Sequence, residues 1–396
     1  MRVTAINCHV LLDPGYDADA TSSNQDTIVV EVETDAGITG VGETDLNAWV
    51  ARACIEAPGT HTMDRGLGAM LIGMDPTDPA ACWEALYRGT AMTGRRGTLM
   101  HALGAIDIAL WDIAGKAAGV PVRDLLGPTR AEPLRPYASL LPNTGGAWED
   151  FAETLAGQAI AAAERGYRAA KLEILTTGPY RHTGLEMPDE RMVDIIAAVR
   201  RAVGDGFAIM VDVGYAWPDW QTALAVIETW EPYDVFFVET PIWTDDIDGY
   251  AELARRAPMD IAAGEWLSSH WEFEEYARCG ALQVLQPDMG RVGGLTEAMR
   301  VGAIAAREDL AVVPHGWKTG LTVAATAHFA SVTPELPFFE FVPPEVAESR
   351  LRRELVVDEL SLQPDGTLPF PERPGIGVEL ERDALAEFAA AARAIG

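Results

Sequence analysis

The chain has 396 residues, and its 60 Asp and Glu against 30 Lys and Arg give a net charge of −30 and an isoelectric point near 4.5. This acidity argues against nucleic acid as a partner, because phosphate binding depends on clustered positive charge. No apolar stretch approaches the ~18 residues that span a bilayer, and Thr4, Asn7 and His9 interrupt the N-terminal apolar run. We therefore expect a cytoplasmic protein with no membrane association.

The first third of the chain predicts a small α+β unit. Two strand-like runs, Val3 to Leu12 and Thr27 to Thr34, come first, and the second continues to Val41 in the pattern of a hairpin with a tight turn. Over residues 100–119, apolar side chains recur at three- and four-residue spacing, which predicts a helix. Strands followed by helices without alternation are typical of α+β units.

From about Pro133, short apolar runs alternate with helical stretches. The predicted strands are Arg135 to Leu140, Ala169 to Leu172, Ala208 to Val211, Val235 to Val238, Ile261 to Ala263, Leu282 to Leu285, Ala311 to Val313 and Phe338 to Phe341. The predicted helices include Asp150 to Arg165, Asp189 to Val203, Gln221 to Trp230, Asp248 to Arg256 and Leu295 to Glu308. Eight such strands predict a parallel α/β barrel, whose active site forms at the carboxyl ends of the strands.

A polar residue stands at the carboxyl end of each strand from the second onward. These residues are Lys171 with Glu173, then Asp212, Glu239, Glu265, Asp288, His315 and Glu340. From Asp212 to Glu340 they follow one another at 23 to 27 residues, the length of one β/α unit. We therefore expect them to face one barrel mouth, which the Gly- and Pro-containing insert at residues 176–189 is able to reach.

Asp212, Glu239 and Glu265 end three consecutive strands. Carboxylates that converge on one mouth raise one another's pKa unless a cation neutralises them. An oxygen-only set of ligands favours Mg²⁺ over zinc, because no His or Cys ligands accompany the acids.

His315 and Asp288 end adjacent strands. The carboxylate there is placed to orient the imidazole and raise its basicity, as a general base requires. A single histidine in such a position is more often a structural hydrogen bonder, but the neighbouring acid and the expected metal favour the base.

Three further residues complete the predicted site. Lys171 and Glu173 stand at i and i+2, so their side chains point the same way. We expect Lys171 to stabilise negative charge on the substrate or to pair with a metal-ligand acid. Glu173 is a candidate substrate contact, second base or partner of Lys171. Glu340 lies among phenylalanines and is either a protonated hydrogen-bond donor or a rim acid paired with an arginine.

Taken together, these residues resemble the pattern of the enolase superfamily, in its mandelate racemase-like subgroup, over essentially the whole chain. The resemblance implies a (β/α)7β barrel at residues 131–342 and an α+β capping domain built from residues 1–130 and 343–396. It implies that Asp212, Glu239 and Glu265 bind Mg²⁺, that His315 and Asp288 form the base, and that Glu340 is an electrophilic acid. It also implies a homo-oligomer.

One departure from the family pattern bears on the reaction. The usual Lys-x-Lys of the second barrel strand is here Lys171-Leu172-Glu173, so the second lysine is absent. With His315 as the clearest base, the resemblance favours dehydration of a sugar acid, an aldonate or an aldarate, to a 2-keto-3-deoxy acid. Three alternatives remain. They are an epimerase or racemase that uses Glu173 or another group as second base, a barrel that binds metal and sugar acid without turnover and, more remotely, a Schiff-base aldolase that uses Lys171.

Substrate specificity is expected to come from loops around the mouth. The candidate side chains are Tyr16, Asn24 and Asn47 in the capping region and Tyr215 and Trp317 in barrel loops, with Trp217 a further possibility.

Overall fold

The computed structural model describes residues 1–19, 22–61, 64–141, 148–182, 184–344 and 347–396. An antiparallel sheet of order β1-β2-β3 opens the chain, with β1 (Val3–Leu12), β2 (Asp26–Thr34) and β3 (Thr39–Thr44). The predicted hairpin is present between β2 and β3. Helices follow: α1 (Ala48–Glu56), α2 (Leu67–Leu71), α3 (Pro79–Gly89), α4 (Thr98–Ala118) and α5 (Val122–Leu126).

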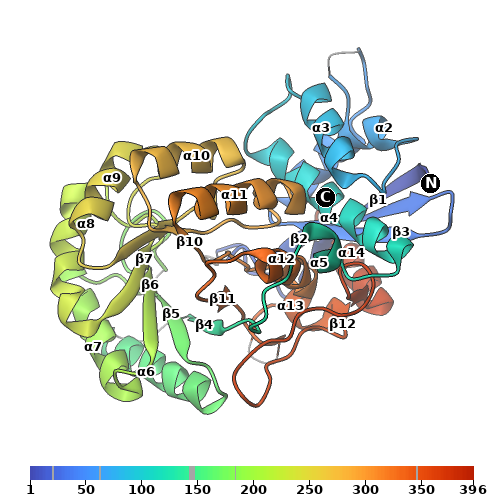
Figure 1. The fold of residues 1–396 in the computed structure, drawn as a ribbon. Helices are drawn as coiled ribbons and strands as arrows, with labels where there is room; N and C mark the ends of the chain where they lie inside the picture. Colours follow the sequence, from blue (N-terminus) through green and yellow to red (C-terminus); the bar gives the residue numbers. More distant parts are fainter. Residues whose placement is uncertain (20–21, 62–63, 142–147, 183, 345–346) are drawn as a thin grey trace.

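The middle of the chain forms an eight-stranded parallel sheet of order β10-β9-β8-β7-β6-β5-β4-β11 (Figure 1). Its strands are β4 (Pro136–Leu140), β5 (Ala169–Glu173), β6 (Ala208–Asp212), β7 (Val235–Glu239), β8 (Asp260–Ala263), β9 (Val284–Leu285), β10 (Ala311–Val312) and β11 (Phe339–Glu340). The sheet curls so that its two ends meet, where the amide of Gly316 after β10 donates to the Glu340 carboxylate on β11 at 2.8 Å. The predicted barrel with a capping domain is confirmed.

Helices cover the outside of the barrel. They are α6 (Trp148–Glu164), α7 (Met192–Val203) after the 3-10 turn η1 (Asp189–Arg191), α8 (Trp220–Ile227), α9 (Ile247–Arg256), α10 (His270–Cys279), α11 (Leu295–Glu308) and α12 (Gly320–Val332). The helix predicted to reach Trp230 ends at Ile227, and the chain continues as the 3-10 helix η2 (Glu228–Tyr233), which contains Pro232. A proline lacks the amide hydrogen that an α-helix would need there.

The C-terminal segment returns to the first sheet. It contains α13 (Arg350–Glu354), the strand pair β12 (Val356–Val357) and β13 (Glu379–Leu380), and α14 (Arg382–Arg393). Helix α14 packs on β1, and the C-terminus lies among the N-terminal elements (Figure 1). An ion pair of 2.7 Å joins Arg382 to Glu31 of β2.

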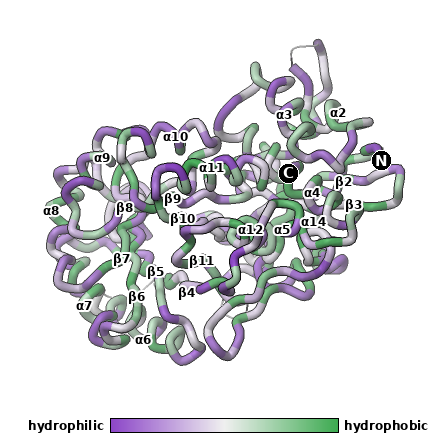
Figure 2. The backbone as a smooth tube through the Cα atoms, viewed as in Figure 1, coloured by the Kyte–Doolittle hydropathy of each residue, from purple (hydrophilic) through white to green (hydrophobic). Residues whose placement is uncertain are grey.

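The core follows the strands and the helix faces that cover them. Figure 2 shows barrel strands such as β6 and β7 in green, in agreement with the full burial of Ile209, Val211 and Val238. The register pairs Glu173 with Asp212 and Asp212 with Glu239, so the carboxyl ends of β5, β6 and β7 lie level. Level strand ends place the polar side chains that follow them in one layer at the barrel mouth.

No helix in the described part of the chain is long and apolar enough to cross a membrane.

Candidate active site

A cavity of about 360 Å³ opens at the carboxyl ends of the strands. Most of the predicted residues line it: Lys171, Glu173, Asp212, Tyr215, Glu265, His315 and Trp317. Ser22 and Ser23 reach it from the capping domain, so both domains contribute to its wall. The cavity therefore lies where a barrel enzyme carries its active site.

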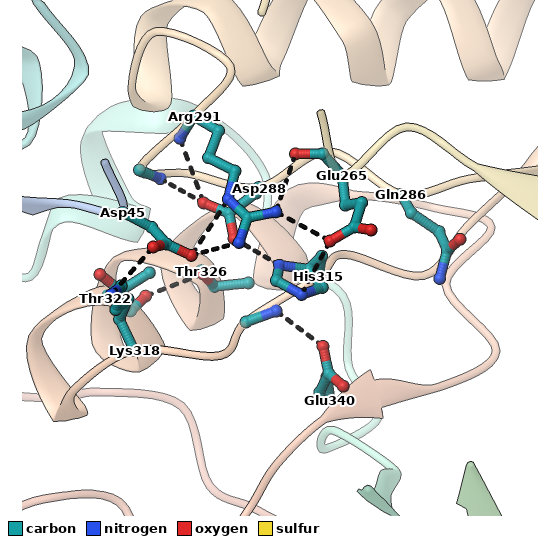
Figure 3. Close-up of polar contacts among 12 residues, drawn as sticks. Asp45, Glu265, Gln286, Asp288, Arg291, His315, Lys318, Thr322, Thr326 and Glu340 are labelled. Atoms are coloured by element: carbon teal, nitrogen blue, oxygen red, sulfur yellow. Dashed lines mark hydrogen bonds and ion pairs between the residues drawn. The ribbon is translucent and has the colours of Figure 1, made fainter. Parts of the chain in front are cut away.

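His315 and Asp288 form the predicted pair. The Nδ1 atom of His315 lies 2.5 Å from Oδ2 of Asp288, and its Nε2 lies 3.4 Å from Oε2 of Glu265 (Figure 3). Burial and Arg291 lower the pKa of His315, but the Asp288 hydrogen bond and the charges of Glu340 and Glu265 outweigh them and raise it to about 9. In this state the imidazole carries a proton at neutral pH, so it must lose that proton before it acts as a base.

Lys171 lies among carboxylates. Its Nζ is 3.0 Å from Glu239, 3.0 Å from Glu340 and 3.9 Å from Asp212. Burial opposes the charged form of this lysine, but Glu239 and Glu340 outweigh it and hold the pKa well above its ordinary value. Lys171 is therefore a fixed positive charge at the base of the cavity.

Glu340 corrects one expectation. It pairs with Lys171 instead of an arginine, and its carboxylate also accepts from Ser139 at 2.5 Å. Burial raises its pKa, but Lys171 and His315 outweigh burial and lower it to about 2. Glu340 is thus ionised, and the prediction of a protonated donor is wrong for this state.

Glu173 has a different environment from Glu340. Burial, together with the charge of Asp212, raises its pKa well above the ordinary value and so favours the protonated carboxyl. Its Oε1 lies 3.8 Å from Nε2 of His182, a buried residue of the insert after β5. The ion pairs that the structure gives to Lys171 go to other acids, so pairing of Glu173 with Lys171 is not found among the described residues.

The three expected metal ligands are close together but are engaged by protein donors. Glu239 accepts from Gln286 at 2.6 Å as well as from Lys171, and Asp212 accepts from Thr240 at 3.0 Å. No group of three or more His, Cys, Asp or Glu side chains in the described part of the chain is arranged to hold a metal ion. The expected ligand set is therefore not preformed.

The chemistry of these acids nevertheless fits a hard divalent cation. Burial raises the pKa of Glu239 to about 8 although Lys171 opposes the rise, and the charges of Asp212 and Glu265 contribute to it. Buried carboxylates that destabilise one another's charged forms are suited to a cation that neutralises them, and their oxygens are the ligands that Mg²⁺ prefers.

The sequence did not reveal Arg291 and Asp45, which lie in contact with the site. Arg291 donates to Asp45 of the capping domain at 3.0 Å through Nε and to Glu265 at 2.8 Å through Nη1 (Figure 3). Lys318 approaches the other oxygen of Asp45 at 2.9 Å. This buried network connects the capping domain to Glu265, and the only sequence signal for it was an arginine three residues after Asp288.

The predicted substrate contacts divide into two groups. Tyr215 and Trp317 line the cavity, and the hydroxyl of Tyr215 donates to Glu265 at 3.2 Å. Tyr16 is 41% exposed and does not line it, and Asn47 caps α1 by accepting from the Val50 amide at 3.2 Å. Asn24 lines a neighbouring cavity of about 200 Å³. The structure therefore does not bring Tyr16 and Asn47 to the cavity wall, and Asn24 lies beside the site; contact of these residues with a substrate stays a prediction.

The fold and the site define a barrel enzyme that carries an acid–base dyad and a carboxylate cluster at the mouth. The model of the mandelate racemase/muconate lactonizing enzyme N-terminal domain matches residues 2–127, and the enolase C-terminal domain-like model matches residues 154–384. The chain belongs to this family of the enolase superfamily.

Characterised relatives cover nearly the same length. D-galactarolactone cycloisomerase of Agrobacterium fabrum is 30% identical over 98% of this chain and 99% of its own. L-rhamnonate dehydratase of Saccharopolyspora erythraea is 30% identical over 89% of this chain and 83% of its own. The crystal structure of 3,6-anhydro-D-galactonate cycloisomerase from Zobellia galactanivorans superimposes with a TM-score of 0.83 at 26% identity, over 98% of this chain and 99% of that one.

Proposed function

We propose that the protein is a Mg²⁺-dependent sugar-acid dehydratase. The observation that carries this proposal is the His315–Asp288 dyad, whose imidazole lines one cavity with the fixed charge of Lys171 and with the partly buried acids Asp212 and Glu265. Sugar-acid dehydratases among the relatives support the same class of substrate.

In the proposed reaction, neutral His315 removes the proton from the carbon next to the substrate carboxylate. Asp288 holds the imidazole in place through Nδ1, which leaves Nε2 to accept the proton. Lys171 stabilises the negative charge that develops on the carboxylate oxygens. The imidazolium then gives its proton to the β-hydroxyl, the C–O bond breaks, and the products are water and an enol that tautomerises to the 2-keto-3-deoxy acid.

Asp212, Glu239 and Glu265 are the residues that would hold Mg²⁺. The bound cation would supply positive charge that attracts and neutralises the carboxylate of the substrate.

A second candidate is ring opening of a sugar-acid lactone. It is favoured by the cycloisomerase of Agrobacterium fabrum, which aligns over nearly all of both chains. The same proton abstraction would then expel a ring oxygen in place of a hydroxyl, and His315 would return the proton to that oxygen. The two reactions are distinguished by mass, because dehydration loses one water and ring opening leaves the mass unchanged.

The proposal is tested with a panel of sugar acids in the presence of Mg²⁺, with keto acid detected as the semicarbazone and product mass by mass spectrometry. We expect His315→Asn to lower kcat by about 10³-fold or more, because it removes the base. Incubation in heavy water separates the alternatives. Incorporation of α-deuterium without keto acid would identify an epimerase, and full α-proton exchange by His315→Asn would exclude His315 as the base.

A control variant keeps the fold and leaves the cavity unchanged. Trp271→Leu alters a 40% exposed ring on α10 that stacks on Tyr87, away from the residues that line the cavity. It should retain wild-type turnover on any substrate that the panel identifies.

A further inference from the structure

One wall of the active-site cavity is aromatic. Tyr180, Tyr215 and Trp266 line it, from the loops that follow β5, β6 and β8. The rings of Tyr215 and Trp266 are stacked, with centroids 4.1 Å apart and an angle of 25° between their planes. Tyr180 meets Trp266 edge to face at 5.3 Å, and Trp243 supports the stack from behind at 5.8 Å. Four rings thus brace one another around a surface that faces the cavity.

The backbone that carries this wall is strained at two positions. Tyr215 has a φ of 59°, and Thr240, directly after the next strand β7, has a φ of 48°. These left-handed conformations are strained for residues other than glycine. The amide of Tyr215 donates to the carbonyl of Thr240 at 2.6 Å, so the two strained residues are joined. Strain of this kind persists where the surrounding structure fixes a side chain for a function.

The positively charged side chains of the cavity already have acidic partners. Among the residues described, the side chains that line it and carry positive charge are Lys171, Arg291 and His315, and His315 is held by Asp288 at 2.5 Å. Lys171 is bound to Glu239 and Glu340, and Arg291 to Asp45 and Glu265. With the proposed function, Lys171 serves the reacting carboxylate. Among the described residues, the cavity therefore places Lys171 for the reacting carboxylate and has no positively charged side chain without an acidic partner to receive a second one.

An aromatic wall discriminates between forms of a sugar acid. An open-chain acid carries a hydroxyl on almost every carbon, and hydroxyls that face aromatic carbon lose hydrogen bonds to water without replacement. A sugar ring gathers C–H groups on one face, and burial of that apolar face against the rings is favourable by about 25 cal/mol per Å².

We infer that the cavity binds a monocarboxylic sugar acid in ring form, with the C–H face of the ring packed against Trp266 and Tyr180. The inference rests on the proposed function for the position of the carboxylate near Lys171. Beyond that function, it specifies that the substrate is a ring and that it carries one carboxylate. The His315–Asp288 dyad and the acids determine neither property.

Binding is measured without turnover, so that the test does not depend on the reaction. The His315→Asn protein with Mg²⁺ is titrated by calorimetry with D-galacturonate, a pyranose ring, and with D-galactonate, an open chain of the same six carbons and one carboxylate. The expected result is tighter binding of the ring by about tenfold or more. D-galactarate, an open chain with two carboxylates, should bind no more tightly than D-galactonate.

Two variants in the same background assign the preference to the wall. Trp266→Leu should reduce the preference for the ring by about tenfold and leave D-galactonate binding unchanged within a factor of two. Trp271→Leu, outside the cavity, should leave both affinities unchanged.

Equal or tighter binding of the open chain, or an equal loss for both ligands in Trp266→Leu, would overturn the inference. The proposed function has its own readout, turnover of the wild-type enzyme on the panel, so either can fail while the other stands. If the wild type turned over open-chain acids and binding showed no preference for the ring, the proposed dehydratase function would stand and the inference of a ring-form substrate would fail. If binding favoured the ring but the wild type turned over no acid, the ring-form inference would stand and the proposed function would fail.

Discussion

Asp107 shows how the environment of one residue sets its charge. Its carboxylate on α4 accepts from the amide of Thr296 at 2.8 Å and from its hydroxyl at 2.6 Å, which joins the capping domain to α11. Burial raises the pKa of Asp107 from 3.8 to about 7, and the hydrogen bonds from Thr296 only partly offset this. Between these two pH values the unfolded carboxyl ionises while the folded one keeps its proton. The contribution of this carboxyl to stability is therefore greatest at low pH and falls as the pH rises through this window.

We expect Asp107→Asn to remove this dependence. The amide has no charge to bury, so the variant should gain stability relative to the wild type as the pH rises from 4 to 8, by up to about 4 kcal/mol. Urea unfolding at a series of pH values measures the difference. Asp248→Asn, which changes an exposed acid on α9, should give the wild-type profile. A constant difference between Asp107→Asn and wild type from pH 4 to 8 would contradict the prediction.

For single residues, the sequence predicted where the side chains of the site lie better than it predicted their charges. The strand-end rule led to Lys171, Asp212 and His315, because the side chain after a barrel strand faces the mouth wherever the strand lies. It left the protonation of Glu340 open, because the charge of Lys171 decides it across the barrel. The rule did not identify Arg291, because the position of this side chain depends on Asp45, which lies 246 residues away in the chain.

At the scale of elements, the packing of β3 on α4 positions the capping domain. Gly42 has so little space that a Cβ atom would lie 1.9 Å from the carbonyl oxygen of Ala105, and at Gly40 it would lie 2.1 Å from that of Ala109. The strand and the helix therefore approach more closely than any larger residue would permit. The hairpin was predictable from its pattern, but this close approach depends on which face of α4 meets the sheet.

Gly42→Ala should consequently destabilise the protein. The added methyl group meets backbone, which cannot move aside as a side chain would, so we expect a loss of about 3 kcal/mol. Gly157→Ala is the matched control, because this helical position on α6 has no atom within 4 Å of the new Cβ. It should gain about 0.5–1 kcal/mol through helix propensity. Chemical denaturation compares the two, and equal effects would show that the contact is not limiting.

Helix α12 shows a limit of pattern reading. Nearly all its residues are buried, since it lies between the barrel and the capping domain and contacts both α5 and β3. A helix that is covered on every side has no polar face, so the alternation that identifies an amphipathic helix is absent. Helices α7 and α9 were predictable because each has one apolar face and one polar face.

For the molecule as a whole, the C-terminal helix joins the end of the chain to its beginning. The ring of Phe388 on α14 is fully buried, and the indole of Trp49 on α1 donates to the carbonyl of Gly396 at 2.9 Å. The capping domain, which supplies Ser22, Ser23 and Asp45 to the site or its support, is thus built from both ends of the sequence.

Phe388→Ala should destabilise the whole enzyme by about 3–5 kcal/mol, the usual cost of the cavity left by a buried phenylalanine. Scanning calorimetry measures the effect, with Arg393→Ala at an exposed position of α14 as the control. If the melting temperature of Phe388→Ala equalled that of the control, α14 would not contribute to the stability of the capping domain.

The sequence by itself determined the order of the strands, the step of one β/α unit and the residues at the strand ends, because these depend on local periodicity. Only the tertiary structure decided which charges meet. It placed Lys171 between Glu239 and Glu340, joined Arg291 to the capping domain, and stacked Tyr215 on Trp266. Pairing, burial and pKa depend on distances between segments far apart in the chain, and no local pattern records those distances.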